Sequence, residues 1–503
     1  MSVWWRTVGR RQIRSSRATI FVATTVALAV GVAGCATKSA GRLSGADSTT
    51  TPTTRAANAA PPPVQLLAAD GVANDNFGGA LWFNTFQKPL KSYYYATPGE
   101  AALSSDGTVA LVGAPAHADA GKTGAGAAYV FTSKAGKWSQ VAQLVPADAS
   151  AYAGFGWSVA MSGDGHDVVI GAPYTDRGAN VDIGAAYFFH EVAGKWSQVA
   201  AIRGADSAAY DGFGWSVALS RDGSTAMVGA TGHTSGGVKK QGAAYVFRKR
   251  GTAWAEVRQL APKVGHPNAE FGGWVALSAD GSTAAVTKLS HLDAQKTYFN
   301  GGTYLFGTSD GWKKSEQLAL FEDPKPNTDG TSDQYGVNVA LSDDGKVAAV
   351  AAPDLNIGAA GGAGATYVYT TTTDWRSAAA NTARTLLPSF PVNFGYYGSS
   401  VALSADGSLL FIGIDGVGSN GQGAGELVRL TRASANAASN AAAKPTTTAI
   451  NAPNTEKGRF GTAVAMSADG STVLATAPWL TIKGAATRGA AYVLTLPVQS
   501  TQP

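Results

Sequence analysis

Three histidines occupy one position of a repeated unit. His117, His233 and His291 are separated by multiples of 58 residues, a spacing that recurs elsewhere in the chain. Neutral imidazole is a common metal ligand, and protonated imidazole can hold an anion. If the units surround an axis, the three side chains could converge there. The alternative is a loop position that favours a polar residue, such as Thr175 in another copy. We adopt the alternative and expect no metal site.

An aspartate–glycine pair is the most regular feature of the sequence. It begins at Asp106, Asp164, Asp222, Asp280, Asp344, Asp406 and Asp469. Calcium prefers six or more oxygen ligands, whereas each of these turns supplies one or two carboxylates. Asp176 and Asp182, in the loop between two strands, form an equally weak option. We therefore expect neither calcium nor any other cofactor.

Motifs for catalysis are poorly represented. The sequence has no G-x-S-x-G motif and no Walker loop, and residues 416–421 match G-x-G-x-x-G without a helix after them. Six histidines and no clustered carboxylate pair leave no nucleophile beside a base. We expect a protein that is not an enzyme. A hydrolase or lyase with a central site is the least favoured alternative.

The repeated unit that positions these residues predicts four strands. In the copy at 155–202, bulky and small residues alternate over 157–162, which indicates a strand with two different faces. A Gly-Asp-Gly turn follows, and further strands are expected at 168–172, 185–189 and 196–202. Seven copies of a four-stranded antiparallel unit predict an all-β, seven-bladed β-propeller.

The two ends of the chain complement each other. The last copy ends near Leu496 without a fourth strand, and residues 64–67 at the other end have strand character. The interval from Asp70 to Phe77 equals that from Asp148 to Phe155. We therefore expect the N-terminal segment to be the outer strand of the last blade, which closes the ring and removes free sheet edges.

The words of the repeat are FG, SVALS, DG, VGAP and GAAYVF, in constant order. They resemble the FG-GAP repeat of integrin-α-type β-propellers over residues 64–497. The resemblance implies a propeller domain with those bounds. Integrin propellers bind calcium through a DxDxDG loop, and no turn here has three alternating acids. Sialidase-type propellers carry S-x-D-x-G-x-x-W, which is also missing.

The N-terminal region has the features of an export signal. Five arginines lie before residue 18, an apolar run covers 19–34, and small residues directly precede Cys35, the only cysteine. This pattern resembles a bacterial lipoprotein signal peptide over 1–34, with acylation of Cys35 and a membrane anchor implied. Residues 35–63, rich in Ser, Thr and Pro, are expected to be a tether. We expect a lipid-anchored protein of the cell envelope.

Charge excludes one class of partner. The net charge of +5 comes from the five N-terminal arginines, so the rest of the chain is neutral and no nucleic-acid surface is expected. Loops from second to third strands and between blades should share one face, and binding residues usually lie on long loops. The candidates on that face are His117, Tyr152, Asp176, Tyr210, His233, His291 and Trp479.

These residues lead to a functional expectation. We expect a monomeric, membrane-anchored propeller that binds a protein or glycan partner through the long loops. The alternative is an envelope assembly factor whose ring is a structural spacer.

Overall fold

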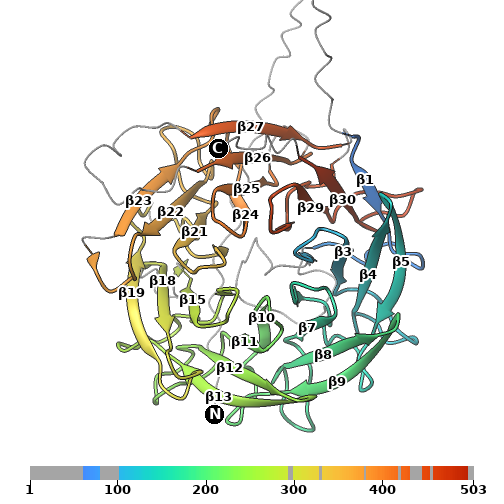
Figure 1. Cartoon of the computed structure of the whole chain (residues 1–503), viewed down its shortest axis with the longest axis horizontal. Helices are drawn as coiled ribbons and strands as arrows, with labels where there is room; N and C mark the ends of the chain where they lie inside the picture. Colours follow the sequence, from blue (N-terminus) through green and yellow to red (C-terminus); the bar gives the residue numbers. More distant parts are fainter. Residues whose placement is uncertain are drawn as a thin grey trace, which may run out of the picture. The chain divides into compact units, whose positions relative to one another are not determined.

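Short segments rich in β-branched and aromatic residues, separated by glycine-rich turns, form seven four-stranded antiparallel sheets arranged as a β-propeller (Figure 1). The computed structural model describes residues 61–79, 101–289, 291–292, 298–327, 331–378, 381–416, 421–430, 445–453 and 457–496, without the side chains of 291–292 and 298–299. Within these ranges no helix is both long and apolar enough to cross a membrane. Cys35 and residues 1–60 lie outside the described residues, as do residues 80–100, which include the aromatic residues Trp82, Phe83, Phe86, Tyr93, Tyr94 and Tyr95.

The strands of each blade follow one another from the axis outward. Blade 1 contains β2 (Ala101–Leu103), β3 (Val109–Ala114), β4 (Ala127–Lys134) and β5 (Lys137–Leu144). Blade 2 contains β6 (Ser158–Met161), β7 (Asp167–Ala172), β8 (Ala185–Val192) and β9 (Lys195–Ile202). Blade 3 contains β10 (Phe213–Leu219), β11 (Thr225–Ala230), β12 (Ala243–Arg250) and β13 (Ala253–Leu260). The expected strands of the 155–202 copy are thus found, with shifts of a few residues at their ends.

The later blades keep this order and add small elements. Blade 4 contains β14 (Val275–Leu277), β15 (Thr283–Lys288), β18 (Gly302–Gly307) and β19 (Glu316–Glu322), with β16 (His291–Leu292) and β17 (Tyr298–Phe299) paired in a loop. Blade 5 contains β20 (Val339–Leu341), β21 (Val347–Ala352), β22 (Ala365–Thr371) and β23 (Asn381–Leu386). Blade 6 contains β24 (Tyr397–Leu403), β25 (Leu409–Ile414), β26 (Ala424–Arg429) and β27 (Thr446–Asn451).

The seventh blade is built from both ends of the chain. It contains β28 (Val464–Met466), β29 (Thr472–Ala477), β30 (Ala490–Thr495) and, outermost, β1 (Val64–Leu66). β1 pairs antiparallel with β30, so that Val64 lies opposite Val493. The N-terminal strand therefore occupies the place that the last repeat leaves empty. One hydrophobic cluster joins this blade to blade 1, with Leu474 and Val493 packed beside Phe77 and Tyr129.

The glycines of the repeat allow neighbouring blades to meet backbone to backbone. A Cβ on Gly126, in the GAAY word of blade 1, would lie 2.0 Å from the carbonyl oxygen of Phe155, in the FG word of blade 2. The same contact recurs at other blade junctions, for example between Gly184 and Phe213 at 2.1 Å. Only glycine fits such an approach. The FG and GAAY words are thus two sides of one contact between blades.

The phenylalanine of each FG word packs on its own blade. The ring of Phe155 lies edge-on to Tyr187 and Phe189, with centroids 5.5 and 6.0 Å away. Phe213 makes the equivalent contacts with Tyr245 and Phe247. Aromatic pairs at these distances and tilts are favourable beyond the apolar area that they bury. The aromatic residues of GAAYVF therefore anchor the segment that carries the FG backbone.

A closed ring of backbone hydrogen bonds joins the seven Asp-Gly turns. In each turn, the residue before the aspartate donates its N–H to the carbonyl oxygen of the corresponding residue in the next blade, at 2.7 to 3.0 Å. The members in order are Ser105, Gly163, Arg221, Ala279, Asp343, Ala405 and Ala468. The N–H of Ala468 donates to Ser105 and closes the ring. Arg221 crosses it, hydrogen-bonded to the Ser105 hydroxyl and, at 2.6 Å, to Asp343.

The aspartates of these turns have a structural role. Asp164 accepts hydrogen bonds from the Ser162 hydroxyl at 2.5 Å and from the backbone of His166 at 3.0 Å. Burial opposes ionisation, but these hydrogen bonds outweigh it and lower the pKa of Asp164. The same serine–aspartate pair is found in every turn, for example between Ser404 and Asp406. The carboxylates are therefore used within the turns.

We predict that Gly126→Ala destabilises the propeller more than Gly136→Ala does. Both glycines have positive φ, 88° and 77°, and alanine at such angles costs about 1–2 kcal/mol. A Cβ on Gly136 meets nothing within 4 Å, whereas one on Gly126 meets the Phe155 backbone. The difference between the two variants in thermal unfolding midpoint isolates the contact between blades. Equal losses would show that this contact contributes nothing.

Candidate functional site

One face of the ring carries the long loops. Loops between second and third strands contact the linkers that lead into the next blade, as the N–H of Tyr152 donates to Thr123 at 2.8 Å and that of Phe155 to Ala125 at 2.9 Å. We call this the long-loop face. The face with the Asp-Gly turns and the turns between third and fourth strands is the short-turn face.

His233 lies buried beneath the long-loop face between two aspartates. Its Nδ1 is 2.8 Å from Asp211 and its Nε2 is 3.3 Å from Asp206. The amide of Gln259 lies 3.1 Å from Nε2, and the imidazole packs edge-on to Tyr245. The side chains of His233 and Asp211 are only 5% and 4% exposed. The network ties a linker, a long loop and two outer strands of blade 3 together.

His117 forms the same network in blade 1. Its Nδ1 is 3.1 Å from Asp75, its Nε2 is 3.6 Å from Asp70, and Gln143 and Tyr129 take the places of Gln259 and Tyr245. In blade 2 the positions of the histidine, the buried aspartate and the glutamine are filled by Thr175, Ala153 and Ala201. The three residues are thus replaced together in blade 2, whereas blade 4 keeps a histidine, His291, and has Ala269 at the position of the aspartate.

The environment of these histidines favours the protonated form. Burial alone would lower the pKa of His233. Its hydrogen bond with Asp211 and the charges of Asp211 and Asp206 have a larger, opposite effect, so the pKa is raised overall. The pKa of His117 is raised for the same reasons, with Asp75 and Asp70 as partners. Each imidazole thus lies between carboxylates that stabilise its protonated form.

The three repeat histidines do not share one site. His117 and His233 contact separate sets of residues, and His291 lies in β16 with its side chain outside the described residues. Blade 4 has Val264 and Ala269 where blade 3 has its two aspartates. No group of three potential metal ligands occurs among the described residues. The sequence predicts that His117 and His233 lie on the binding face. Both are buried instead, because each imidazole lies between carboxylates below the loops.

The other candidate residues do lie in the long loops. Tyr210 is 63% exposed, whereas Tyr152 is half-buried and packs in an aromatic cluster with Trp157. Asp176 is exposed, and its carboxylate accepts the N–H of Asp182 at 2.8 Å. Tyr210 is therefore the most accessible of the predicted aromatic residues.

Trp479 is held by a neighbouring cation. The guanidinium of Arg459 lies 4.2 Å from the centre of its ring, and Arg459 also pairs with the buried Asp415 at 3.3 Å. Burial raises the pKa of nearby Asp354 to about 7, and the charge of Asp415 adds to the rise. Trp479 is thus half-buried within a polar network of blades 5 to 7.

Sequence reasoning missed the most exposed apolar segment of this face. Between β23 and β24, Phe390 is 86% exposed and Phe394 is 63% exposed, with Leu387 and Val392 beside them in sequence. Other exposed apolar residues in linkers are Val72 and Val264. The signal was present in the sequence, since LLPSFPVNF is the most apolar of the linkers.

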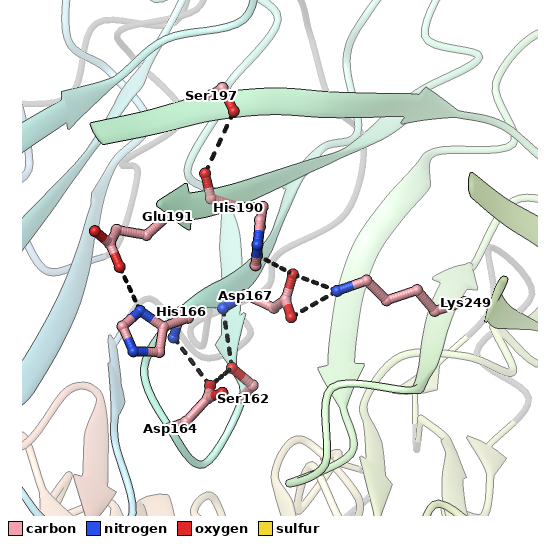
Figure 2. Close-up of polar contacts among 8 residues, drawn as sticks. All are labelled: Ser162, Asp164, His166, Asp167, His190, Glu191, Ser197 and Lys249. Carbon is pink, nitrogen blue, oxygen red and sulfur yellow. Dashed lines mark hydrogen bonds and ion pairs between the residues drawn. The ribbon is translucent and has the colours of Figure 1, made fainter. Parts of the chain in front are cut away.

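A second polar cluster lies on the short-turn face between blades 2 and 3 (Figure 2). Both carboxylate oxygens of Asp167 accept hydrogen bonds at 2.7 Å from Lys249, which reaches across from β12, and His190 Nδ1 lies 3.0 Å from the same carboxylate. Ser197 donates to the backbone carbonyl of His190 rather than to its imidazole. The serine, histidine and aspartate therefore form no nucleophile–base relay, and the lysine–aspartate pair joins two blades.

We predict that His233→Thr costs about 2 kcal/mol of stability, since it leaves the buried carboxylate of Asp211 without its main partner. Adding Asp211→Ala gives two of the three residues found in blade 2, removes the unpaired carboxylate and should recover about half of that loss. Urea unfolding of both single variants and the double variant measures the coupling. Additive losses would contradict a coupled unit.

The pH dependence has a defined sign. The folded pKa of His233 lies above its unfolded value, so its stabilising effect is complete below about pH 6.5 and is lost as the pH rises through the folded pKa. Stability of the parent protein should fall over this range more than that of the double variant.

Comparison with known proteins agrees with this architecture. Residues 138–189 and 196–247 match the family described as FG-GAP repeat. No curated protein matches the chain. Among solved structures, the chain is similar to one described as Kuenenia stuttgartiensis hydrazine synthase, with a TM-score of 0.50 and 14% identity over 82% of this chain and 100% of that one. At this identity the likeness concerns the fold alone. The chain is therefore similar to the FG-GAP repeat over two segments that lie in blades 1 to 3, and its seven four-stranded sheets form a β-propeller.

Proposed function

We propose that this protein is a membrane-anchored, non-enzymatic propeller that binds a protein partner through the linker between β23 and β24 on the long-loop face. The observation that carries the proposal is the exposure of Phe390 and Phe394 in one short segment. Exposed apolar clusters on a folded domain are typical of interaction sites, and aromatic side chains supply much of the binding energy at interfaces.

The chemistry of the segment favours a protein over a glycan. Leu387, Phe390, Val392 and Phe394 have no side-chain hydrogen-bonding groups, and a sugar needs such groups to satisfy its hydroxyls. A protein partner can cover these side chains with its own apolar residues. Tyr210, exposed on another linker of the same face, adds an aromatic surface with a polar end.

The rigid scaffold supports the same function. The ring of backbone hydrogen bonds joins all seven blades, so the linkers are carried by a closed frame. Binding residues are commonly carried by loops on such frames. The sequence around Cys35 supports an anchor: a basic segment, an apolar run and small residues before the cysteine.

Replacing Phe390 and Phe394 by serine should reduce capture of the partner at least tenfold, because about 2 kcal/mol or more is commonly lost with an aromatic anchor. The measurement is quantitative cross-linking and pull-down from native envelopes, followed by affinity measurement with the purified partner. Val192→Ser is the matched control, since Val192 is also 63% exposed but lies in β8, at the turn to β9. Equal capture by all variants would overturn the proposal. If the double variant lost only the capture of a glycan, the segment would be a glycan-binding site and the proposal of a protein partner would be wrong.

The anchor has a separate test. Cys35→Ala should abolish labelling by a palmitate analogue and move the protein from the membrane fraction to the soluble fraction, since two or more acyl chains are needed for stable attachment. A variant that stays in the membrane fraction without the label would show that attachment does not depend on Cys35.

A further inference from the structure

A groove of about 560 Å³ opens on the short-turn face, between blades 4 and 5. Its walls are the Asp-Gly turns of both blades and the turns between their third and fourth strands. A second hollow of about 430 Å³ continues along the outer strands and shares Leu318, Trp375 and Arg376 with the first. No residue of the long-loop face lines either hollow, so this site is separate from the linker between β23 and β24.

Longer turns create the groove. In blade 1 the third and fourth strands are joined by Ala135 and Gly136 alone, whereas residues 308–315 and 372–380 join them in blades 4 and 5. Each long turn contains a buried tryptophan whose indole N–H donates to a glycine carbonyl of the Asp-Gly turn: Trp312 to Gly281 at 2.7 Å and Trp375 to Gly345 at 2.6 Å. These hydrogen bonds attach each long turn to the Asp-Gly turn of its own blade, and together the turns form the walls of the groove.

The carboxylates in the groove are already engaged by the protein. Arg376 of blade 5 donates to Glu316 of blade 4 at 2.8 Å and to Asp374 of its own turn at 2.9 Å. Asp344 accepts hydrogen bonds from Ser342 at 2.7 Å and from the backbone of Lys346 at 3.0 Å. These oxygens keep lone pairs that can still accept hydrogen bonds from a ligand hydroxyl.

The two lysines of the groove have fewer contacts with the protein than its carboxylates do. Lys314 and Lys346 line the groove, one from each blade. The charge of Lys314 helps to lower the pKa of Asp310 in the same turn, and within the described part of the chain neither ammonium group pairs directly with a carboxylate. The hydroxyls of Ser309, Ser315 and Thr373 lie along the same walls. The groove therefore offers two ammonium donors, several hydroxyls and engaged carboxylates, which together suit a ligand with both hydroxyl groups and negative charge.

We propose that this groove binds an acidic saccharide, with Lys314 and Lys346 holding its carboxylate or phosphate groups. The serine and threonine hydroxyls and the carboxylates of Glu316 and Asp374 pair with the sugar hydroxyls. Arg376 positions both carboxylates, since it contacts each of them. The site needs both blades, and the ion pair between Arg376 of blade 5 and Glu316 of blade 4 links its two walls.

Calorimetric titration of the full chain tests the site with matched probes. A galacturonate hexamer should bind, and its fully methyl-esterified form, which has the same backbone without the charge, should bind at least tenfold more weakly. A mannose oligosaccharide bearing phosphate distinguishes phosphate from carboxylate as the preferred group. Inorganic phosphate alone should bind weakly, because it lacks the sugar hydroxyls.

Variants locate the binding to this groove. Lys314→Ser with Lys346→Ser should weaken binding of the acidic probe at least tenfold without changing the unfolding temperature. Lys134→Ser with Lys195→Ser removes the same charge from exposed positions beside the short turns of blades 1 and 2 and should change affinity less than twofold. Equal binding of the ester, equal binding of inorganic phosphate, equal effects of the two double variants, or no binding of either acidic sugar would each overturn the proposal.

Discussion

Contact between backbones of neighbouring blades is the constraint on which this structure depends. Seven sheets can surround an axis only if their inner edges approach closely, and a side chain at Gly126 or Gly184 would fill the space that the next blade's carbonyl occupies. On the short-turn face the approach becomes direct, through the ring of hydrogen bonds that Ala468 closes onto Ser105. The ring pairs the backbone groups of seven partly buried residues near the axis. The glycine words of the repeat are therefore a requirement of geometry.

This constraint divides the molecule into parts that can and cannot vary. Residues of the Asp-Gly turns are fixed by the ring, and a Cβ on Gly163 would lie 2.4 Å from the side chain of Arg221. In the linkers and long loops, close backbone contact between blades is required only at the FG and GAAY words. Between those words the residues differ from blade to blade. The histidine–aspartate units of blades 1 and 3 occupy such a region, which blade 2 fills with threonine and alanine.

Much of the fold could be predicted from the sequence because repetition supplies its own alignment. The spacing of the Asp-Gly pairs gives seven units, and the missing fourth strand of the last unit points to residues 64–67, where β1 pairs with β30. The site was harder to predict. The burial of His117 is decided by Asp75 and Gln143, which are distant in sequence, so spacing between histidines alone is not informative. Comparison of blades 1 to 3 at all three positions would have revealed the unit, because His233, Asp211 and Gln259 are replaced together in blade 2.

The most open surfaces occur where the repeat loses its regularity. The first blades keep the 58-residue period, and the hairpins between their outer strands are tight, with Ala193 and Gly194 at positive φ in blade 2. Blades 4 and 5 are longer, and their extra residues fall in outer turns and linkers, away from the ring and the FG contacts. Trp254 of blade 3 stacks on Phe188 of blade 2, with ring centroids 4.3 Å apart. Trp375 of blade 5 instead donates its indole N–H to the carbonyl of Gly345 and lies edge-on to Phe321. The groove thus opens where the turns between outer strands can lengthen without disturbing the contacts between blades. A scaffold of repeated units can therefore form a groove of this kind only at those blades that depart from the repeat.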